Sequence, residues 1–125
     1  MIRVNFGLDE KKRSATLRME GHAGLASPGQ DIVCASASIL AYTLAQEIKI
    51  AEKRGELRYK PRLHLRGGNA NISCRYKDPS ILRAFLTVQT GFALLAHNYP
   101  DYVMLETMLG DEKSEEVPHG YDING

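Results

Sequence analysis

The sequence has no long apolar run and very little cysteine. No apolar stretch approaches the roughly 18 residues that a membrane span requires, so no transmembrane helix is expected. The N-terminus also lacks a basic start followed by an apolar stretch and a small-residue cleavage site, which predicts a cytoplasmic protein without a signal peptide. The two cysteines, Cys34 and Cys74, are expected to be free thiols, because structural disulfides are rare in a reducing compartment.

Motifs for nucleotides and metals are missing as well. The sequence contains neither a P-loop nor the glycine pattern of a dinucleotide-binding turn. Its histidines and cysteines lack the paired short spacings of structural zinc sites. We therefore expect no metal and no cofactor.

Charge is unevenly distributed, although the net charge is only +1. From Lys49 to Arg66 seven basic residues face two acidic ones, giving +5, whereas from Asp111 to Gly125 five acidic residues face one lysine, giving −4. The basic stretch could contact RNA, but Tyr59 is its one nearby aromatic residue, and a stacking platform has several. This pattern favours a solvated face over an RNA site.

The length of 125 residues fits one domain with a real core. We expect a single domain over residues 1–109 and an acidic, mobile tail over residues 110–125, where apolar residues are few.

Hydrophobic periodicity predicts the order β-β-α-β-β-α-β. The expected elements are a hairpin with strands near 2–6 and 15–19, a helix from about Asp31 to Arg54, strands at about 58–66 and 69–76 joined by a Gly67-Gly68 turn, a helix starting at Asp78-Pro79, and a strand from Tyr102 to Leu109. This order favours an α+β fold: a two-layer sandwich in which two helices cover one face of a mainly antiparallel sheet.

The same periodicity predicts which side chains face the core. Cys74 shares one face of its strand with Ile72 and Tyr76, while polar residues occupy the other face, so Cys74 is expected to pack in the core. His64, which lies between two leucines, should face solvent. The apolar positions of the helices are Val33, Ala37, Leu40, Leu44, Ile48 and Ala51 in the first, and Ile81, Phe85, Val88, Phe92 and Leu95 in the second.

The start of the first helix is ambiguous. Asp31 is a good N-cap and would make Cys34 the third helical residue, whereas Ser27 followed by Pro28 is an alternative cap with proline in the first turn. We prefer Asp31, because Gly29 would weaken an earlier turn.

A histidine and a cysteine lie at the two ends of the glycine-rich segment from Gly21 to Cys34, GHAGLASPGQDIVC. A thiol is a good nucleophile only as thiolate, which a helix N-terminus favours. His22 can take the thiol proton and return one to a leaving amine. Spacing permits contact between them without requiring it, so core packing of the cysteine remains the alternative.

Other residues of this segment have open roles. The carboxylate of Asp31 opposes thiolate formation as an N-cap, but it stabilises the imidazolium as a partner of His22. Ser38, one turn after Cys34, either supports the site or bonds back to a helix carbonyl. Gly24, Pro28 and Gly29 are expected to let the loop from 23 to 30 open and close over a peptide.

The motif Gly21-His22-Ala23-Gly24, then Gly29, then Asp31-Ile32-Val33-Cys34-Ala35, with Ser38 following, closely resembles the ribosomal-processing cysteine protease family (Prp). That resemblance implies that Cys34 is the nucleophile and His22 the general base, with Asp31 and Ser38 as motif positions. It also implies a homodimer with a mobile loop between the catalytic residues.

By the same resemblance, the substrate is the precursor of ribosomal protein twenty-seven of the large subunit, whose short N-terminal extension is removed during ribosome maturation. Two other functions compete with this one. The first is a non-catalytic ribosome- or RNA-associated binding module, which the basic stretch suggests. The second is a thiol hydrolase that acts on a small molecule.

Overall fold

The computed structural model describes residues 1–21, 28–67, 69–108 and 120–123. The elements follow the predicted order and are β1 (Ile2–Asp9), β2 (Ser14–Glu20), α1 (Pro28–Lys53), β3 (Arg62–Arg66), β4 (Asn69–Arg75), α2 (Ile81–Asn98) and β5 (Val103–Met108). None of the helices in these residues is apolar over a length that would cross a membrane.

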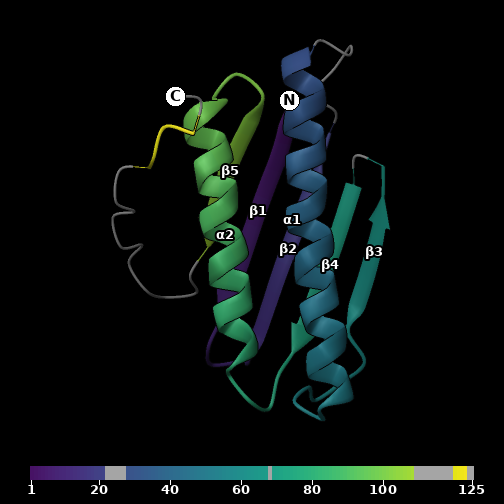
Figure 1. Ribbon diagram of the computed structural model, residues 1–125. Coiled ribbons are helices and arrows are strands. Elements are labelled where there is room, and N and C mark those ends of the chain that lie inside the picture. Colours follow the sequence, from purple (N-terminus) through teal and green to yellow (C-terminus); the bar gives the residue numbers. More distant parts are fainter. Residues whose placement is uncertain (22–27, 68, 109–119, 124–125) are drawn as a thin grey trace.

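The five strands form one open sheet in the order β3-β4-β2-β1-β5 (Figure 1). Neighbouring strands are antiparallel except β1 and β5, which are parallel and bring the two ends of the domain together. The backbone N–H of Ile2 extends this pairing by donating to the carbonyl of Tyr102 at 2.7 Å. The sheet is therefore mainly antiparallel, as predicted.

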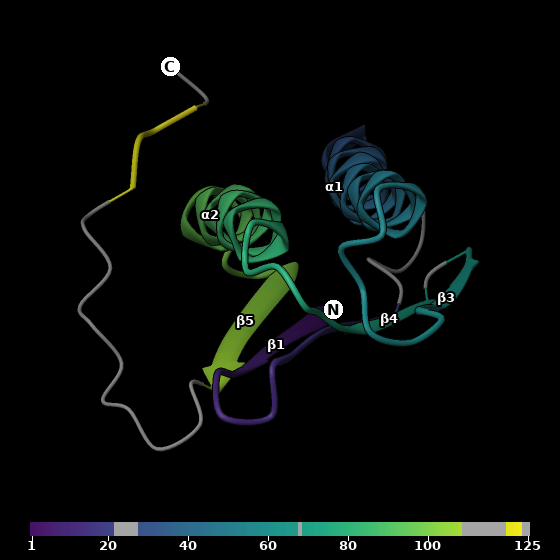
Figure 2. The same ribbon diagram turned by 90° about the horizontal axis from the view of Figure 1, so that it is seen from below.

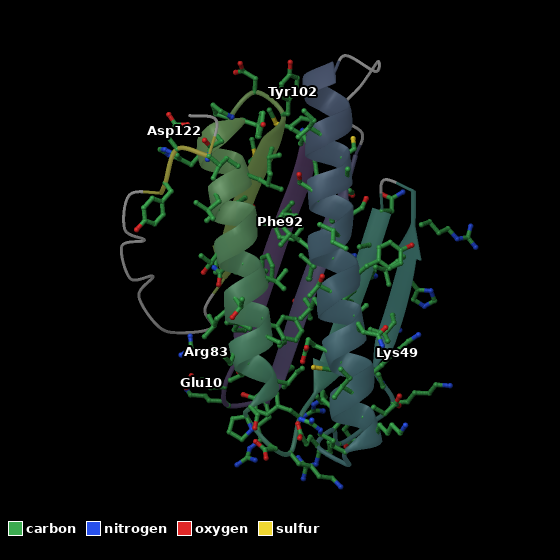
Figure 3. All side chains as sticks on the ribbon, viewed as in Figure 1. Glu10, Lys49, Arg83, Phe92, Tyr102 and Asp122 are labelled. Carbon is green, nitrogen blue, oxygen red and sulfur yellow. The ribbon has the colours of Figure 1, made fainter. Side chains whose placement is uncertain are left out.

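Both helices lie on the same face of the sheet, as Figure 2 shows, so the domain has two layers. The core fills the space between the layers. The rings of Phe6 on β1 and Phe92 on α2 meet there edge to face, with centroids 5.9 Å apart; Figure 3 labels Phe92. The helices can approach closely because Gly91 has no side chain: a Cβ there would lie 2.6 Å from Cδ2 of Leu40.

The predicted core faces are confirmed. The buried residues of α2 are those of the predicted stripe. Cys74 is buried together with Ile72 and Tyr76, and His64 is exposed. On α1 the predicted stripe is buried except at Leu40, which is half-buried and packs against the core. Alternation and helical spacing thus identified the apolar faces correctly.

The starts of both helices were predicted wrongly. Helix α1 begins at Pro28 rather than Asp31, because proline suits the first turn of a helix and Gly29 does not prevent that turn from forming. Helix α2 begins at Ile81 rather than at Asp78-Pro79. The carboxylate of Asp78 instead accepts hydrogen bonds from the backbone N–H, at 2.9 Å, and the hydroxyl of Ser80, the residue that precedes the helix.

The described part of the tail contacts the end of α2. The side chain of Asn98 donates to the carbonyl of Tyr121 at 2.9 Å and accepts from the backbone N–H of Ile123 at 2.9 Å. The predicted mobility of the tail falls mostly on residues 109–119, which lie outside the described part. The division into a domain and a tail stays a prediction.

Candidate active site

The end of β2 and the start of α1 lie at the same end of the molecule (Figure 1). Glu20, the last residue of β2, pairs with Arg3 near the start of β1. Gly21 then turns the chain with φ at +101°, and a Cβ at this position would lie 2.3 Å from the carbonyl oxygen of Met1. Only glycine fits both constraints without strain, so Gly21 fixes where the chain leaves the sheet.

Cys34 lies on α1, close to this end. It is the seventh residue of the helix, which begins at Pro28. Its side chain is half-buried and packs against the core, between the buried Val33 and the exposed Ala35 in sequence. The thiol therefore lies at the boundary between core and surface, where a substrate can approach it.

The earlier start of α1 changes how the helix acts on this thiol. The backbone N–H of Cys34 lies four residues after the carbonyl of Gln30, which is the spacing of a bond within the helix. Unpaired N–H groups and the helix dipole act mainly in the first turn, and Cys34 is in the second. The N-terminus of α1 therefore lies farther from Cys34 than the sequence suggested, and a base becomes more important.

Cys74, the other cysteine, has a different environment. Both thiols are free, but Cys74 is only 4% exposed on β4. Burial raises the pKa of the Cys74 thiol to about 11, because the core does not solvate a thiolate. Cys74 is thus a protonated core residue at neutral pH and cannot serve as a nucleophile.

The remaining predicted site residues are only partly placed. His22 and Gly24 lie outside the described residues, so their contacts stay predictions. Asp31 is within the first turn of α1. Pro28 and Gly29 are the first two residues of α1, so their assignment to the loop was wrong, and any loop between His22 and Cys34 ends before Pro28. Ser38 is half-buried one turn after Cys34.

A hollow of about 370 Å³ beside the end of β2 was not predicted. Its polar lining comes from three neighbouring strands and consists of Arg18, Glu20, His64, Arg66, Asn69 and Asn71. Alternation predicted that such residues share a face within each strand. It could not show that β4 lies between β2 and β3, because strand order depends on long-range pairing.

Metal ligands are not gathered at this end or elsewhere in the described part of the chain, where no group of three histidine, cysteine, aspartate or glutamate residues could hold an ion. The absence of a cofactor stays a prediction. His64 is exposed on β3 and His97 lies in the last turn of α2, so neither histidine is on the helix that carries Cys34.

Solved structures with the same fold include SMU.848 from Streptococcus mutans. Its sequence is 22% identical, the alignment covers 88% of this chain and 96% of the Streptococcus mutans chain, and the TM-score is 0.65. The ribosomal processing protease Prp from Staphylococcus aureus has been solved with a covalently linked product peptide and with a substrate peptide. These two are 21% and 20% identical, each with a TM-score of 0.61, and cover 86% of this chain and 99% of their own.

The comparison of sequences is decisive for the family. No curated protein matches this chain. The family model of the cysteine protease Prp, however, matches residues 1–104 of the 125, which is most of the domain. The chain is therefore a cysteine protease of the Prp family.

Proposed function

We propose that this protease removes the N-terminal extension of ribosomal protein twenty-seven of the large subunit, with Cys34 as the nucleophile and His22 as the general base. The observation that carries the proposal is the contrast between the two thiols. Cys34 is half-buried near the start of α1, at the end of the domain where β2 also ends, whereas Cys74 is buried in the core (Figure 1). A cysteine protease needs a thiol that substrate can reach.

The reaction follows from these two groups. The sulfur of Cys34 attacks the scissile carbonyl carbon while its proton passes to the imidazole of His22. The imidazolium then gives that proton to the leaving amine as the peptide bond breaks, which leaves a thioester on Cys34. Water activated by His22 hydrolyses the thioester and restores both groups.

A peptide substrate is supported by relatives of the same fold. The Staphylococcus aureus enzyme is described as a ribosomal processing protease and binds both substrate and product peptides. Because the chain belongs to a family of cysteine proteases, the alternative function as a non-catalytic binding module is not supported. We further propose that the reaction belongs to ribosome maturation and takes place in the cytoplasm; the description of the Staphylococcus aureus enzyme as a ribosomal processing protease supports this proposal.

Residues near Cys34 are proposed to position the reacting groups. Ser38 lies four residues later on α1, so it shares a side of the helix with Cys34. Asp31 precedes Cys34 by three residues and shares that side too. Gly24 belongs to the segment before Pro28 that would admit the peptide. Substitution of any of these three residues should lower the cleavage rate less than substitution of His22 or Cys34.

We also propose a homodimer, which an apolar row on α1 supports. Ile32, Ile39 and Tyr42 recur at spacings of seven and three, so they lie along one stripe of the helix. They are 55%, 64% and 54% exposed. Large apolar side chains gathered on one exposed stripe are typical of a surface that binds another protein. Sedimentation of the Ile39→Asp variant should show a shift towards monomer.

The extended ribosomal protein is the substrate that tests the proposal. Purified enzyme is incubated with the full-length precursor and with the mature form, and the new N-terminus is identified by mass spectrometry. We expect one cut in the precursor and none in the mature protein. Cys34→Ala and His22→Ala should each lower kcat/KM at least about a thousandfold.

Cys74→Ala is the matched control, because it removes the same atom from a thiol outside the site. Its cleavage rate should stay near that of the unmodified enzyme under conditions where the variant is folded. If the Cys34→Ala variant cleaves the precursor at an undiminished rate, the assignment of Cys34 as the nucleophile is wrong. If the precursor stays intact while other peptides are cleaved, the substrate is wrong.

A further inference from the structure

The sheet has one face that no described element covers. Both helices pack on the opposite face (Figure 2), and the side chains that point away from them are polar on four of the five strands. Arginine predominates among the exposed ones. The open face carries Arg3, Arg18, Arg62, Arg66 and Arg75, whereas its acidic residues are Asp9, Glu20 and Glu106.

Strand register gathers the positive charge on one half of this face. Asn71 on β4 pairs with His64 on β3 and with Arg18 on β2, so these three form a row across the strands. Ser73, two residues along, pairs with Arg62 on β3 in the next row. Rows on the same face of a sheet are about 7 Å apart, and adjacent strands about 4.8 Å. Long basic side chains therefore border the short polar ones of β4.

The guanidinium groups of Arg18, Arg62 and Arg66 are free to bind a ligand. None of them has a hydrogen bond or ion pair in the described part of the chain. Arg75 differs, because it donates to the carbonyl of Lys12 at 3.0 Å and lies over the ring of Tyr59. We define the arginine face as Arg18, Arg62 and Arg66 together with the polar residues of β4 between them, Asn69, Asn71 and Ser73.

We propose that the arginine face binds the phosphate backbone of RNA. Guanidinium groups match phosphate oxygens through paired hydrogen bonds, and amide and hydroxyl groups such as those on β4 add further donors. In the hollow beside the end of β2, Arg18 and Arg66 oppose one carboxylate, Glu20, and Arg62 lies on the same face of β3, four residues before Arg66. This surface therefore complements a polyanion.

The mode of binding follows from what the face contains. It has no aromatic residue on which bases could stack, so the contact is electrostatic and independent of sequence. Its hollow is lined by Glu20, the residue before Gly21, so RNA would lie next to the protease site without occupying it. The inference adds to the proposed cleavage and does not depend on it.

The basic stretch of the sequence does not form this surface as a unit. Lys49 and Lys53 are on α1 rather than on the sheet, although Lys49 lines a hollow together with Arg62 and His64 at the β3 edge; Figure 3 shows Lys49 projecting from that helix. Only Arg62 and Arg66 of the stretch belong to the arginine face, and Arg18 joins them from β2 through the sheet. The fold, rather than sequence proximity, assembles the site.

Salt-dependent binding of a labelled RNA hairpin tests the proposal. Fluorescence anisotropy is measured from 50 to 300 mM salt for the full chain, for Arg18→Gln/Arg62→Gln/Arg66→Gln, and for a control with the same charge change on the helix side of the domain, Lys53→Gln/Arg54→Gln/Arg83→Gln. We expect the first triple variant to lose at least about tenfold in affinity at 100 mM salt. The slope of log K against log salt should fall by about two to three.

The control should stay within about threefold of the unmodified chain, and Glu20→Gln should bind about threefold more tightly. Thermal unfolding shows whether each variant is folded. Cys34→Ala should bind RNA normally, which separates this test from that of the protease. Equal losses in both triple variants, or no salt-dependent binding by the unmodified chain, would overturn the proposal.

Two further measurements exclude other occupants. Polyglutamate is added at the same charge concentration as the RNA. If it competes as well as unlabelled RNA does, the face recognises acidic polymers in general, and the RNA assignment fails. Sedimentation is run on the arginine variant as well. If that variant changes from dimer to monomer, the face is a contact between copies, which also overturns the proposal.

Discussion

The two cysteines of this chain have the same side chain and opposite environments. Cys34 is half-buried on α1 near the end of the domain, whereas Cys74 is 4% exposed on β4, on the core side of the sheet. Burial raises the pKa of the Cys74 thiol to about 11 and keeps it protonated. The comparison shows that the position of a thiol between core and surface decides whether it can react.

A second difference concerns what holds each residue in place. Cys74 is fixed by β4, which pairs with strands on both sides. Cys34 is held by the first turns of α1, which begins at Pro28. The proposed nucleophile therefore lies near a helix end, in a less extensively paired part of the fold than Cys74, as is common for sites that must admit substrate.

The largest expected effect is on chemical modification. Iodoacetamide should alkylate Cys34 in the folded protein at least about a thousandfold faster than Cys74, because Cys74 is reached only when the sheet opens. Peptide mapping by mass spectrometry measures both rates, and activity should fall in step with modification of Cys34. In urea the two rates should converge. Comparable rates in the folded state would break the contrast between the cysteines.

Gly21→Ala should destabilise the fold by about 3 kcal/mol, because alanine is strained at positive φ and its Cβ would clash with the Met1 carbonyl. It should also lower cleavage by displacing the chain that leads to His22, while Cys74 stays protected from alkylation. Gly67→Ala is the control, since a Cβ there meets nothing within 4 Å. Urea unfolding should show a change below about 0.5 kcal/mol for that variant. Equal effects of both substitutions would contradict the role of Gly21.

Alkaline pH should destabilise the fold through Cys74. The folded-state pKa of about 11 lies above the ordinary value of 9.0, so the unfolded chain loses this proton first as pH rises. The contribution of the neutral thiol is fully present below pH 9 and is lost as pH rises to about 11, a loss on the order of 2 kcal/mol. Urea unfolding at pH 8 and pH 11 should show a smaller loss for Cys74→Ala. The same pH dependence in both proteins would assign the effect to other groups.

The smallest expected effect is at Ser38. Ser38→Ala should lower kcat/KM by about two- to tenfold if its hydroxyl helps to position the groups around Cys34. Ser36→Ala is a matched control on the same helix, because the Ser36 hydroxyl already donates to the carbonyl of Ile32 at 2.7 Å. Its activity should be unchanged. A normal pH profile and rate for Ser38→Ala would remove Ser38 from the site.

Local pattern explains why much of the fold could be predicted. The stripe on α2 and the alternation around Cys74 depend on helical and strand periods, which the sequence displays directly. The helix starts were less predictable, because several nearby residues can end a loop. At Pro28 the preference of proline for the first turn outweighed the weakness of Gly29.

Pairing between strands that are far apart in the chain could not be predicted from local sequence patterns. The sequence did not show that β5 is parallel to β1, or that β4 lies between β2 and β3. The arginine face depends on that order and was therefore missed. For the active site, the motif predicts Cys34 as the nucleophile, which stays a proposal, and its contact with His22 depends on residues 22–27, which lie outside the described part of the chain.

The parallel pair of β1 and β5 has a consequence for synthesis of the protein. Strand β1 cannot gain its second neighbour until β5, Val103–Met108, is available. Until then one side of β1 is an unpaired edge with free backbone groups. Cys34 is therefore synthesised well before the five-stranded sheet that supports its helix can be completed.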